Sequence, residues 1–278
     1  MLRSLYTGVN GLRTHQTMMD VVGNNIANVN TAGYKTSTTV FQDVLSQTLQ
    51  GAAAPGVPAG TTGGTNPAQV GLGVQLGGIS TNTSQGSSQL TGRSTDLAVQ
   101  GDGYFVVQQN GEELYTRAGS FNLDATGQLV TTSGGLVRAV PGSPGATAGG
   151  FIRVPTDGSI ESFSIGPDGR VSGVRSDGTG IQALGQVALA TFPNPGGLEK
   201  AGGSLLRVSQ NSGPVILGAG APGANGRGTL AVGVLEMSNV DLAQEFTNLI
   251  VAQRGFQANS RIISASDEIL QDLVNLKR

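Results

Sequence analysis

The chain has 278 residues, a net charge of −2 and only 12% charged residues, so it carries no basic field that would bind nucleic acid or an anionic membrane. Aromatic residues make up 4% of the chain and tryptophan is absent, which argues against a base-stacking surface. Cysteine is absent and histidine occurs once, which excludes disulfides and thiolate nucleophiles and denies a zinc site or a histidine-based triad its partners.

Residues 1–35 are predicted to form a helix. Apolar residues recur along one face at steps of three and four, and Gly33 can adopt a positive φ angle that closes the helix. The outer face is unusual because it consists of Asn, Thr, Gln and Gly. No charged residue lies between Asp20 and Lys35, and the four asparagines in that stretch would cost a helix about 2–3 kcal/mol relative to alanine.

This first segment also bears on localisation. It has no apolar run of 7–15 residues, so it does not have the pattern of a secretory signal peptide. No segment of the chain approaches 18 consecutive apolar residues, so we expect no membrane insertion. If the protein leaves the cytoplasm, we expect it to be exported without a cleaved signal peptide.

Residues 36–86 are predicted to be an extended connector rich in Gly and Pro. Residues 51–69 contain no core-forming side chains and have low complexity. The stretch "GLGVQLGG" at residues 71–78 has the spacing GxGxxxG and no predicted helix after it, so it is not a dinucleotide-binding loop.

Residues 87–235 are predicted to form an antiparallel all-β domain. Hairpins are indicated at Asn110-Gly111, between Asp124 and Gly127, and between Pro167 and Gly169, and "LGQVALATF" at residues 184–192 has the pattern of a buried strand. Short strands with regular glycine turns favour a sandwich or a barrel-like sheet. The Asp-Gly pairs lack the spacing of a calcium loop and are interpreted as turns.

Residues 236–278 are predicted to form a second helix, with Ser238 or Asn239 as its N-cap. Apolar residues follow a seven-residue repeat, with Gln253, Ser260 and Asp267 at the remaining stripe positions. Heptad spacing indicates that the two terminal helices pair as a coiled coil. The alternative is two amphipathic helices that pack on their own domain. The fold class is therefore mixed, with a β domain inserted between the N- and C-terminal helices.

The ends of the chain resemble a known family. "NNIANVNT" at residues 24–31, and "SNVDLAQEF" and "AQRGFQANS" at residues 238–246 and 252–260, resemble the terminal signatures of the flagellar hook and rod family. "GGTNPAQVGLGVQLGGI" and "GRSTDLAVQGDGYFVV" resemble the axial β domain of hook and distal-rod proteins. Within the family, the connector and the C-terminal ending are more similar to short, single-domain hook proteins. The distal rod protein remains the alternative.

The resemblance implies a structural subunit of the bacterial flagellar hook, which self-assembles into a helical tube and acts as a flexible coupling for motor torque. It implies partners in copies of the chain itself, the distal rod, hook–filament junction proteins, the hook cap and the flagellar type III export apparatus, and a location in the extracellular hook or the basal body. We expect no catalytic, cofactor or metal site.

The paired helices would line the inside of the tube, with their uncharged polar residues hydrogen-bonded across subunit contacts. The residues expected in these assembly contacts are Leu5, Leu12, Met19, Val22, Asn24, Asn25, Ile26, Asn28, Val29, Asn30, Leu242, Phe246, Leu249, Phe256, Asn259, Ile263, Leu270 and Leu273.

Two other classes of function remain open. An extracellular adhesin would use the β domain as a binding module and the helices as an oligomerising stalk. A carbohydrate-active enzyme would need a pair of carboxylates, and the scarcity of aromatic residues, which usually line sugar clefts, disfavours it.

Overall fold

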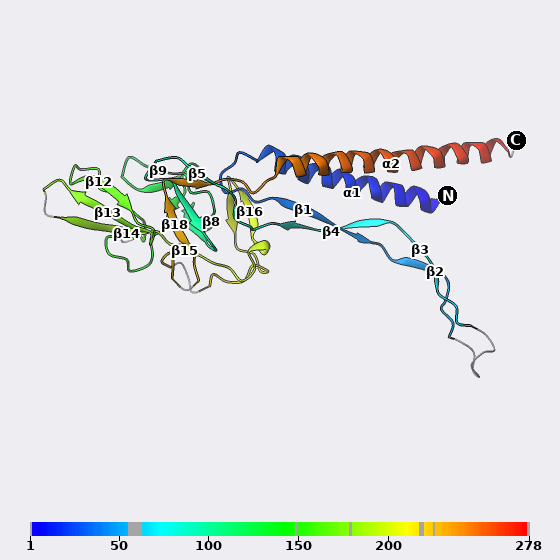
Figure 1. Cartoon of the computed structure of the whole chain (residues 1–278), viewed down its shortest axis with the longest axis horizontal. Helices are drawn as coiled ribbons and strands as arrows, with labels where there is room; N and C mark the ends of the chain where they lie inside the picture. Colours follow the sequence, from blue (N-terminus) through cyan, green and yellow to red (C-terminus); the bar gives the residue numbers. More distant parts are fainter. Residues whose placement is uncertain are drawn as a thin grey trace. The chain divides into compact units, whose positions relative to one another are not determined.

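The computed structural model describes residues 2–54, 63–147, 149–177, 180–216, 220–224 and 226–276. It confirms the mixed fold class, with a helix at each end and antiparallel β structure between them (Figure 1). The chain divides into two compact units. The helical unit comprises residues 1–27, 37–80 and 241–278, and the β unit comprises residues 28–36 and 81–240.

The helical unit contains helices α1 (Leu2–Ala27) and α2 (Leu242–Asn275), which lie side by side (Figure 1). They run antiparallel, because Gly8 contacts Ile263 while His15, further along α1, contacts the earlier Gly255. A Cβ atom added to Gly255 would lie 2.4 Å from the His15 ring. The helices thus approach closely where one of them has only hydrogen as a side chain.

The ends of both helices differ from the sequence prediction. Helix α1 stops at Ala27, and Asn28 begins a turn in which its backbone carbonyl and side-chain oxygen accept hydrogen bonds from Thr31. Gly33 has the expected positive φ, 69°, but it lies beyond this turn and does not close the helix. Helix α2 is capped by Asp241, whose side chain accepts hydrogen bonds from the Ala243 and Gln244 amides, rather than by the two residues predicted.

The predicted connector is a β ribbon. Strand β1 (Ser37–Asp43) pairs with β4 (Val74–Thr81), and β2 (Ser46–Gln50) pairs with β3 (Ala68–Gly71). The "GLGVQLGG" stretch lies in β3 and β4, as expected for β structure. Residues 55–62 of the low-complexity segment lie outside the described residues. Thr7 of α1 donates a hydrogen bond to the Leu72 carbonyl, 3.4 Å away, and links the ribbon to the helix.

The β unit contains an antiparallel eight-stranded sheet and three smaller sheets. The large sheet has the strand order β16-β17-β8-β7-β11-β10-β9, and β15 pairs with β7 beyond this path. Its strands are β7 (Tyr104–Gln109), β8 (Glu112–Thr116), β9 (Phe121–Leu123), β10 (Leu129–Thr131), β11 (Leu136–Val137), β15 (Leu189–Ala190), β16 (Glu199–Gly202) and β17 (Leu205–Arg207). The smaller sheets are built from β5 (Ser88–Leu90), β6 (Leu97–Gln100), β12 (Ile160–Ile165), β13 (Arg170–Arg175), β14 (Ile181–Gln186), β18 (Thr229–Val232) and β19 (Val234–Glu236).

The three predicted hairpins are confirmed as β7–β8, β9–β10 and β12–β13. Asn110 and Gly111 both have positive φ angles, 53° and 83°, as a two-residue type I′ turn requires. The predicted strand at residues 184–192 is buried but broken. Its first part belongs to β14 and its second part to β15, which pair in different sheets.

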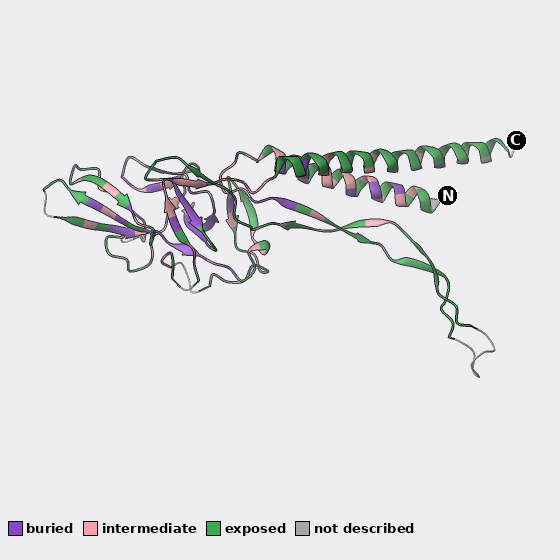
Figure 2. Ribbon diagram, in the orientation of Figure 1, coloured by how far each residue is buried: buried purple, intermediate pink, exposed green. Residues whose placement is uncertain are grey.

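The main core lies inside the β unit, where the central strands β6, β7 and β15 bury successive residues on both of their faces (Figure 2). Phe105 and Phe121 are both fully buried and meet edge to face, with ring centroids 5.1 Å apart. A second cluster lies around Tyr115 and Phe192, whose centroids are 4.8 Å apart. The β unit therefore has the apolar core that an independently folding domain requires.

Gly119 is a test of this packing. A Cβ atom there would lie 1.6 Å from the Leu97 carbonyl oxygen, which is backbone and cannot rotate away. We expect Gly119→Ala to destabilise the β unit by about 3 kcal/mol or more, as overpacking of a rigid site does. Gly196→Ala is the matched control, because its Cβ would make only an ordinary contact of 3.5 Å. Thermal unfolding followed by circular dichroism measures both, and equal melting temperatures would contradict the packing described here.

Candidate assembly surfaces

The seam between α1 and α2 is built from small and polar residues at heptad spacing. On α2 the buried positions are Glu245, Ala252 and Ser266, and the half-buried Asn259 completes a series of four positions seven residues apart. Ser266 contacts Ser4 of α1, with hydroxyl oxygens 3.4 Å apart, and Asn259 packs over Gly11. Along this row the small side chains allow the two helix backbones to approach closely.

The predicted stripe on α2 lies partly beside the seam and partly on the exposed surface in the single chain. Leu249, Phe256, Ile263 and Leu270 flank the seam and are half-buried. The other predicted positions, Phe246, Gln253, Ser260 and Asp267, are exposed. The seam is bordered by this apolar row on one side and by the row from Glu245 to Ser266 on the other. The second row consists of small and polar residues, which an apolar pattern does not reveal.

The remaining predicted assembly residues fall into three groups in the single chain. Two are buried: Val22 and Asn25. Seven are half-buried: Leu5, Leu12, Met19, Ile26, Asn28, Val29 and Asn259. Three are exposed: Asn24, Asn30 and Leu242. The side chain of Leu273 lies outside the described residues. An assembly role for these residues remains a prediction.

Asn25 already has partners inside its own chain. Its side-chain nitrogen donates to the Ser37 carbonyl at 2.8 Å, and its side-chain oxygen accepts from the Ser37 amide at 3.1 Å. The buried amide thus mimics one rung of a β ladder and attaches the first residue of β1 to α1. Any role of Asn25 in subunit contacts would act through the position of Ser37.

The outward surface of α2 carries an exposed apolar row near its C-terminal end in the single chain. Ile262, Ile269 and Leu276 recur every seven residues and are 44%, 51% and 82% exposed. Figure 2 shows most of the length of α2 as exposed. A row of large apolar side chains in water is typical of a protein–protein contact surface. This row continues along the helix on one side of the seam, as a surface for a neighbouring helix would.

A buried charge cluster lies in the β unit, where its chain enters and leaves. The Glu236 side chain is fully buried in β19. One of its oxygens accepts from Lys35 at 2.6 Å and from the Gly86 amide at 3.1 Å, and the other accepts from Arg117 at 3.3 Å. Arg117 also donates to the carbonyls of Val99 and Gly101. The carboxylate therefore joins four separate parts of the chain.

Burial and charge oppose each other in this cluster. Burial lowers the pKa of Lys35, and the hydrogen bond to Glu236 only partly offsets this effect. Burial raises the pKa of the Tyr104 hydroxyl, with the nearby Arg117 acting in the opposite direction. The Arg117 guanidinium lies 5.4 Å from the centre of the Tyr104 ring, in a cation–π contact. The cluster is thus a desolvated site whose charges depend on each other.

Asn239, the second residue of "SNVDLAQEF", strengthens the same junction. Its side-chain oxygen accepts from the Thr36 amide at 2.8 Å, and its side-chain nitrogen donates to the carbonyls of Asn82 and Ser84. The sequence predicts Asn239 as a helix cap, but its side-chain amide instead bonds to the segments around Thr36 and around residues 82–84. Ser238 instead accepts from the Val240 amide.

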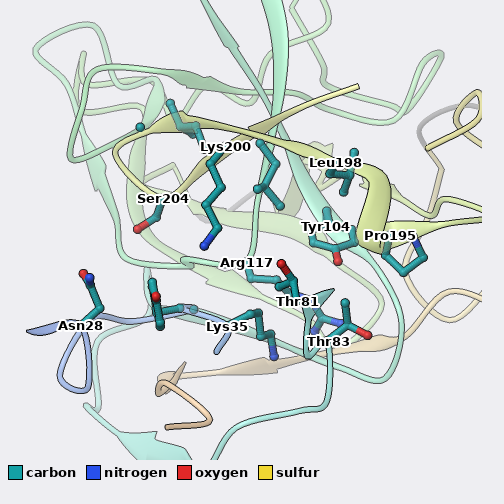
Figure 3. A pocket seen from close by; sticks show the side chains of 15 residues that line it. Asn28, Lys35, Thr81, Thr83, Tyr104, Arg117, Pro195, Leu198, Lys200 and Ser204 are labelled. Carbon is teal, nitrogen blue, oxygen red and sulfur yellow. The ribbon is translucent and has the colours of Figure 1, made fainter. Parts of the chain in front are cut away.

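An open cavity of about 180 Å³ adjoins the charge cluster within the β unit (Figure 3). Lys200 reaches into it from β16, and its ammonium lies 5.2 Å from the centre of the Tyr34 ring. Burial lowers the pKa of Lys200. We call this hollow the Lys200 cavity.

Sequence reasoning missed the charge cluster and the cavity. Lys35, Arg117 and Glu236 are far apart in the sequence and match no motif. The one available signal was Lys35, which ends a 14-residue stretch without charge that begins after Asp20. A single lysine there is an expensive choice for a buried position unless it meets a carboxylate.

Comparison with known families gives three matches along the chain. Residues 5–35 match "Flagella basal body rod protein", residues 98–173 match "Flagellar hook protein FlgE/F/G D1 domain", and residues 231–276 match "Flagellar basal body rod FlgEFG protein C-terminal". The matched parts include most of both helices, part of the large sheet and all three charged residues of the cluster, Lys35, Arg117 and Glu236.

Whole-chain relatives have the same character. The chain is 53% identical over 278 residues to flagellar basal-body rod protein FlgG of Bacillus subtilis, covering 100% of both chains. It is 39% identical over 278 residues to FlgG of Caulobacter vibrioides, covering 99% of this chain and 100% of that one. It is 30% identical to flagellar hook protein FlgE of Borreliella burgdorferi over 448 aligned positions, covering 100% of both chains. No described helix is long and apolar enough to cross a membrane.

The charge cluster can be tested with Glu236→Gln. The variant keeps the shape of the side chain but leaves Lys35 and Arg117 buried without a counter-charge, which costs about 3–5 kcal/mol. Glu113→Gln is the control, because Glu113 forms an exposed ion pair with Arg138, and such pairs contribute about 0–1 kcal/mol. Chemical denaturation of the β unit measures both. Equal unfolding free energies for the two variants would show that the cluster does not stabilise the junction.

Proposed function

Because the chain belongs to the family of flagellar hook and basal-body rod proteins, we propose that it is a subunit of the distal rod, which polymerises with copies of itself into a tube of the flagellar axis. Membership of the family makes it a structural protein of the flagellum. The position in the rod, the tube and the partners are the proposal. The neighbouring axial proteins and the flagellar export apparatus would be its other partners.

Equal length supports the rod over the hook. The rod relatives from Bacillus and Caulobacter align over 278 positions, the length of this chain. The hook relatives from Borreliella and Treponema need 448 and 469 positions, so they carry large additional segments. The sequence alone predicts a hook protein, and these relatives support the alternative, the distal rod protein, better.

A hook subunit is the second candidate. The observation that favours it is that both hook relatives still match 100% of this chain, so the extra segments are insertions into a shared framework. The single β unit seen here is then what a hook protein without such insertions would contain.

Polymerisation is supported by one structural observation above the others. The α2 row of Ile262, Ile269 and Leu276 is exposed in the single chain, whereas the β unit buries most of its large apolar residues in a core and leaves only some, such as Leu90 and Ile181, exposed. Burying an isoleucine fully is worth about 1.5–3 kcal/mol. A tube that packs helices against each other would gain this free energy for each residue of the row that it buries, in every subunit.

The position along the axis can be tested in a strain that lacks the gene. Electron microscopy of its isolated basal bodies should show a truncated rod and no hook if the chain is the distal rod protein. A complete rod that lacks only the hook would contradict the rod proposal and support the second candidate. Complementation with the intact gene is the control for effects on neighbouring genes.

The polymer contact can be tested with Ile269→Asp. A buried aspartate in a helix contact costs more than the lost isoleucine burial, so we expect the critical concentration for polymerisation to rise about 10-fold or more. Ser264→Asp adds the same charge at an exposed position outside the apolar row and should have little effect. Sedimentation of purified protein gives both values. If Ile269→Asp polymerised like the wild type, this row would not be a subunit contact.

A further inference from the structure

We propose that the Lys200 cavity is a docking site for a second copy of this chain, which inserts Leu45 into its apolar part and places Asp43 beside the Lys200 ammonium. The proposal deepens the proposed function, since it rests on the chain forming a polymer. It assigns one contact of that polymer to named residues on both sides.

The wall of the cavity is mostly apolar. Leu198, Leu205 and Leu206 contribute side chains to it, together with the rings of Tyr34 and Tyr104. Its volume of about 180 Å³ is close to that of the engineered apolar cavity, about 150 Å³, that binds benzene. It is smaller than the pockets of about 300–1,000 Å³ that hold drug-sized ligands. The cavity therefore suits one branched or aromatic side chain.

The charge of the cavity selects an anionic neighbour. Its lining contains Lys35, Arg117 and Lys200 and no acidic residue. Glu236 supplies one negative charge against Lys35 and Arg117, so three basic side chains line a site that faces this one buried carboxylate. In Figure 3 the Lys200 side chain extends into the cavity. An apolar side chain with a carboxylate next to it would match both the wall and the charge.

The ribbon of the helical unit presents such a pair. Leu45 is 85% exposed, more than any other large apolar residue among the described ones. It lies between β1 and β2, where Val44 is held by a hydrogen bond from its amide to the Gly73 carbonyl. Asp43 is exposed, Val44 is half-buried and Leu45 is exposed, so Asp43 and Leu45 point to the same side of the extended chain, about 6–7 Å apart.

Charge exchange tests this contact. Lys200→Glu and Asp43→Lys should each raise the critical concentration for polymerisation, by about three- to ten-fold, because each places like charges together. Combining them in one chain should restore most of the wild-type value. The control combines Lys200→Glu with Asp20→Lys, which makes the same change in net charge at another exposed acid and should give no rescue. The melting temperature of the β unit should be unchanged throughout, which separates docking from folding.

Cross-linking tests whether the contact joins two copies. The chain has no cysteine, so a Leu45→Cys protein mixed with a Thr83→Cys protein can form a mixed disulfide only between chains. Thr83 lines the cavity and is half-buried, and a disulfide needs Cα atoms within about 7 Å. We expect the mixed dimer in oxidised polymer, and none when Ser176→Cys, at an exposed position of β-unit chain outside the cavity lining, replaces Thr83→Cys.

The outcomes separate the two proposals. If the wild-type chain forms no polymer, the proposed function itself fails. If it polymerises but shows neither charge rescue nor the mixed disulfide, the docking contact alone is wrong. Weakened polymerisation by Lys200→Glu without rescue by Asp43→Lys would mean that another segment occupies the cavity, which also overturns the assignment of Leu45 and Asp43.

Discussion

The buried carboxylate of Glu236 is the interaction on which the arrangement of the chain depends. It holds Lys35, which follows α1, to a strand that precedes α2, and it holds both to Arg117 at the end of β8. The Gly33 amide donates to the Glu236 carbonyl, and the Thr36 amide donates to Asn239. The two segments that connect the units therefore run next to each other through the edge of the β unit. A carboxylate that is shielded from solvent and paired with two cations cannot lose one of them without a large cost in free energy. The segments that carry the three charges are therefore held in place together.

The uncharged asparagine-rich stretch after Asp20 has several separate explanations rather than one. Asn28 begins the turn that ends α1, where asparagine is favoured because its side chain bonds to nearby backbone. The Asn25 side chain bonds to both the amide and the carbonyl of Ser37, as a neighbouring β-strand would. The stretch also contains the buried Val22, so part of its surface faces the interior of the helical unit rather than water. The cost in helix propensity is thus offset by specific bonds within the chain, before any subunit contact is considered.

The parts of the fold that were predictable from sequence are those set by local rules. The Asn110-Gly111 hairpin follows from the φ angles that its turn requires, and the row from Leu249 to Leu270 follows from heptad spacing. The side of α2 that forms the seam was not predictable, because Glu245, Asn259 and Ser266 carry no apolar signal. The sequence predicts only a connector for the ribbon, because its strands are largely exposed and the segment that joins β2 to β3 is rich in Gly and Pro. The Glu236 cluster and the Lys200 cavity bring together residues that are far apart in the sequence, so no motif or residue spacing predicts them.

The two units differ in where their stability originates, and this difference fits a protein that assembles. The β unit has an apolar core, a second aromatic cluster and a closed ion network. Among the described residues of the helical unit, Val22 and Ala252 are the only apolar side chains that are buried. The same unit leaves Leu45, Ile269 and Leu276 exposed to water. A two-stranded ribbon is marginal by itself in water, and an exposed helix gains most of its stability from packing an apolar face. In the proposed polymer, neighbouring molecules would supply much of the free energy that orders the helical unit, and the exposed side chains that leave it weak alone would make those contacts.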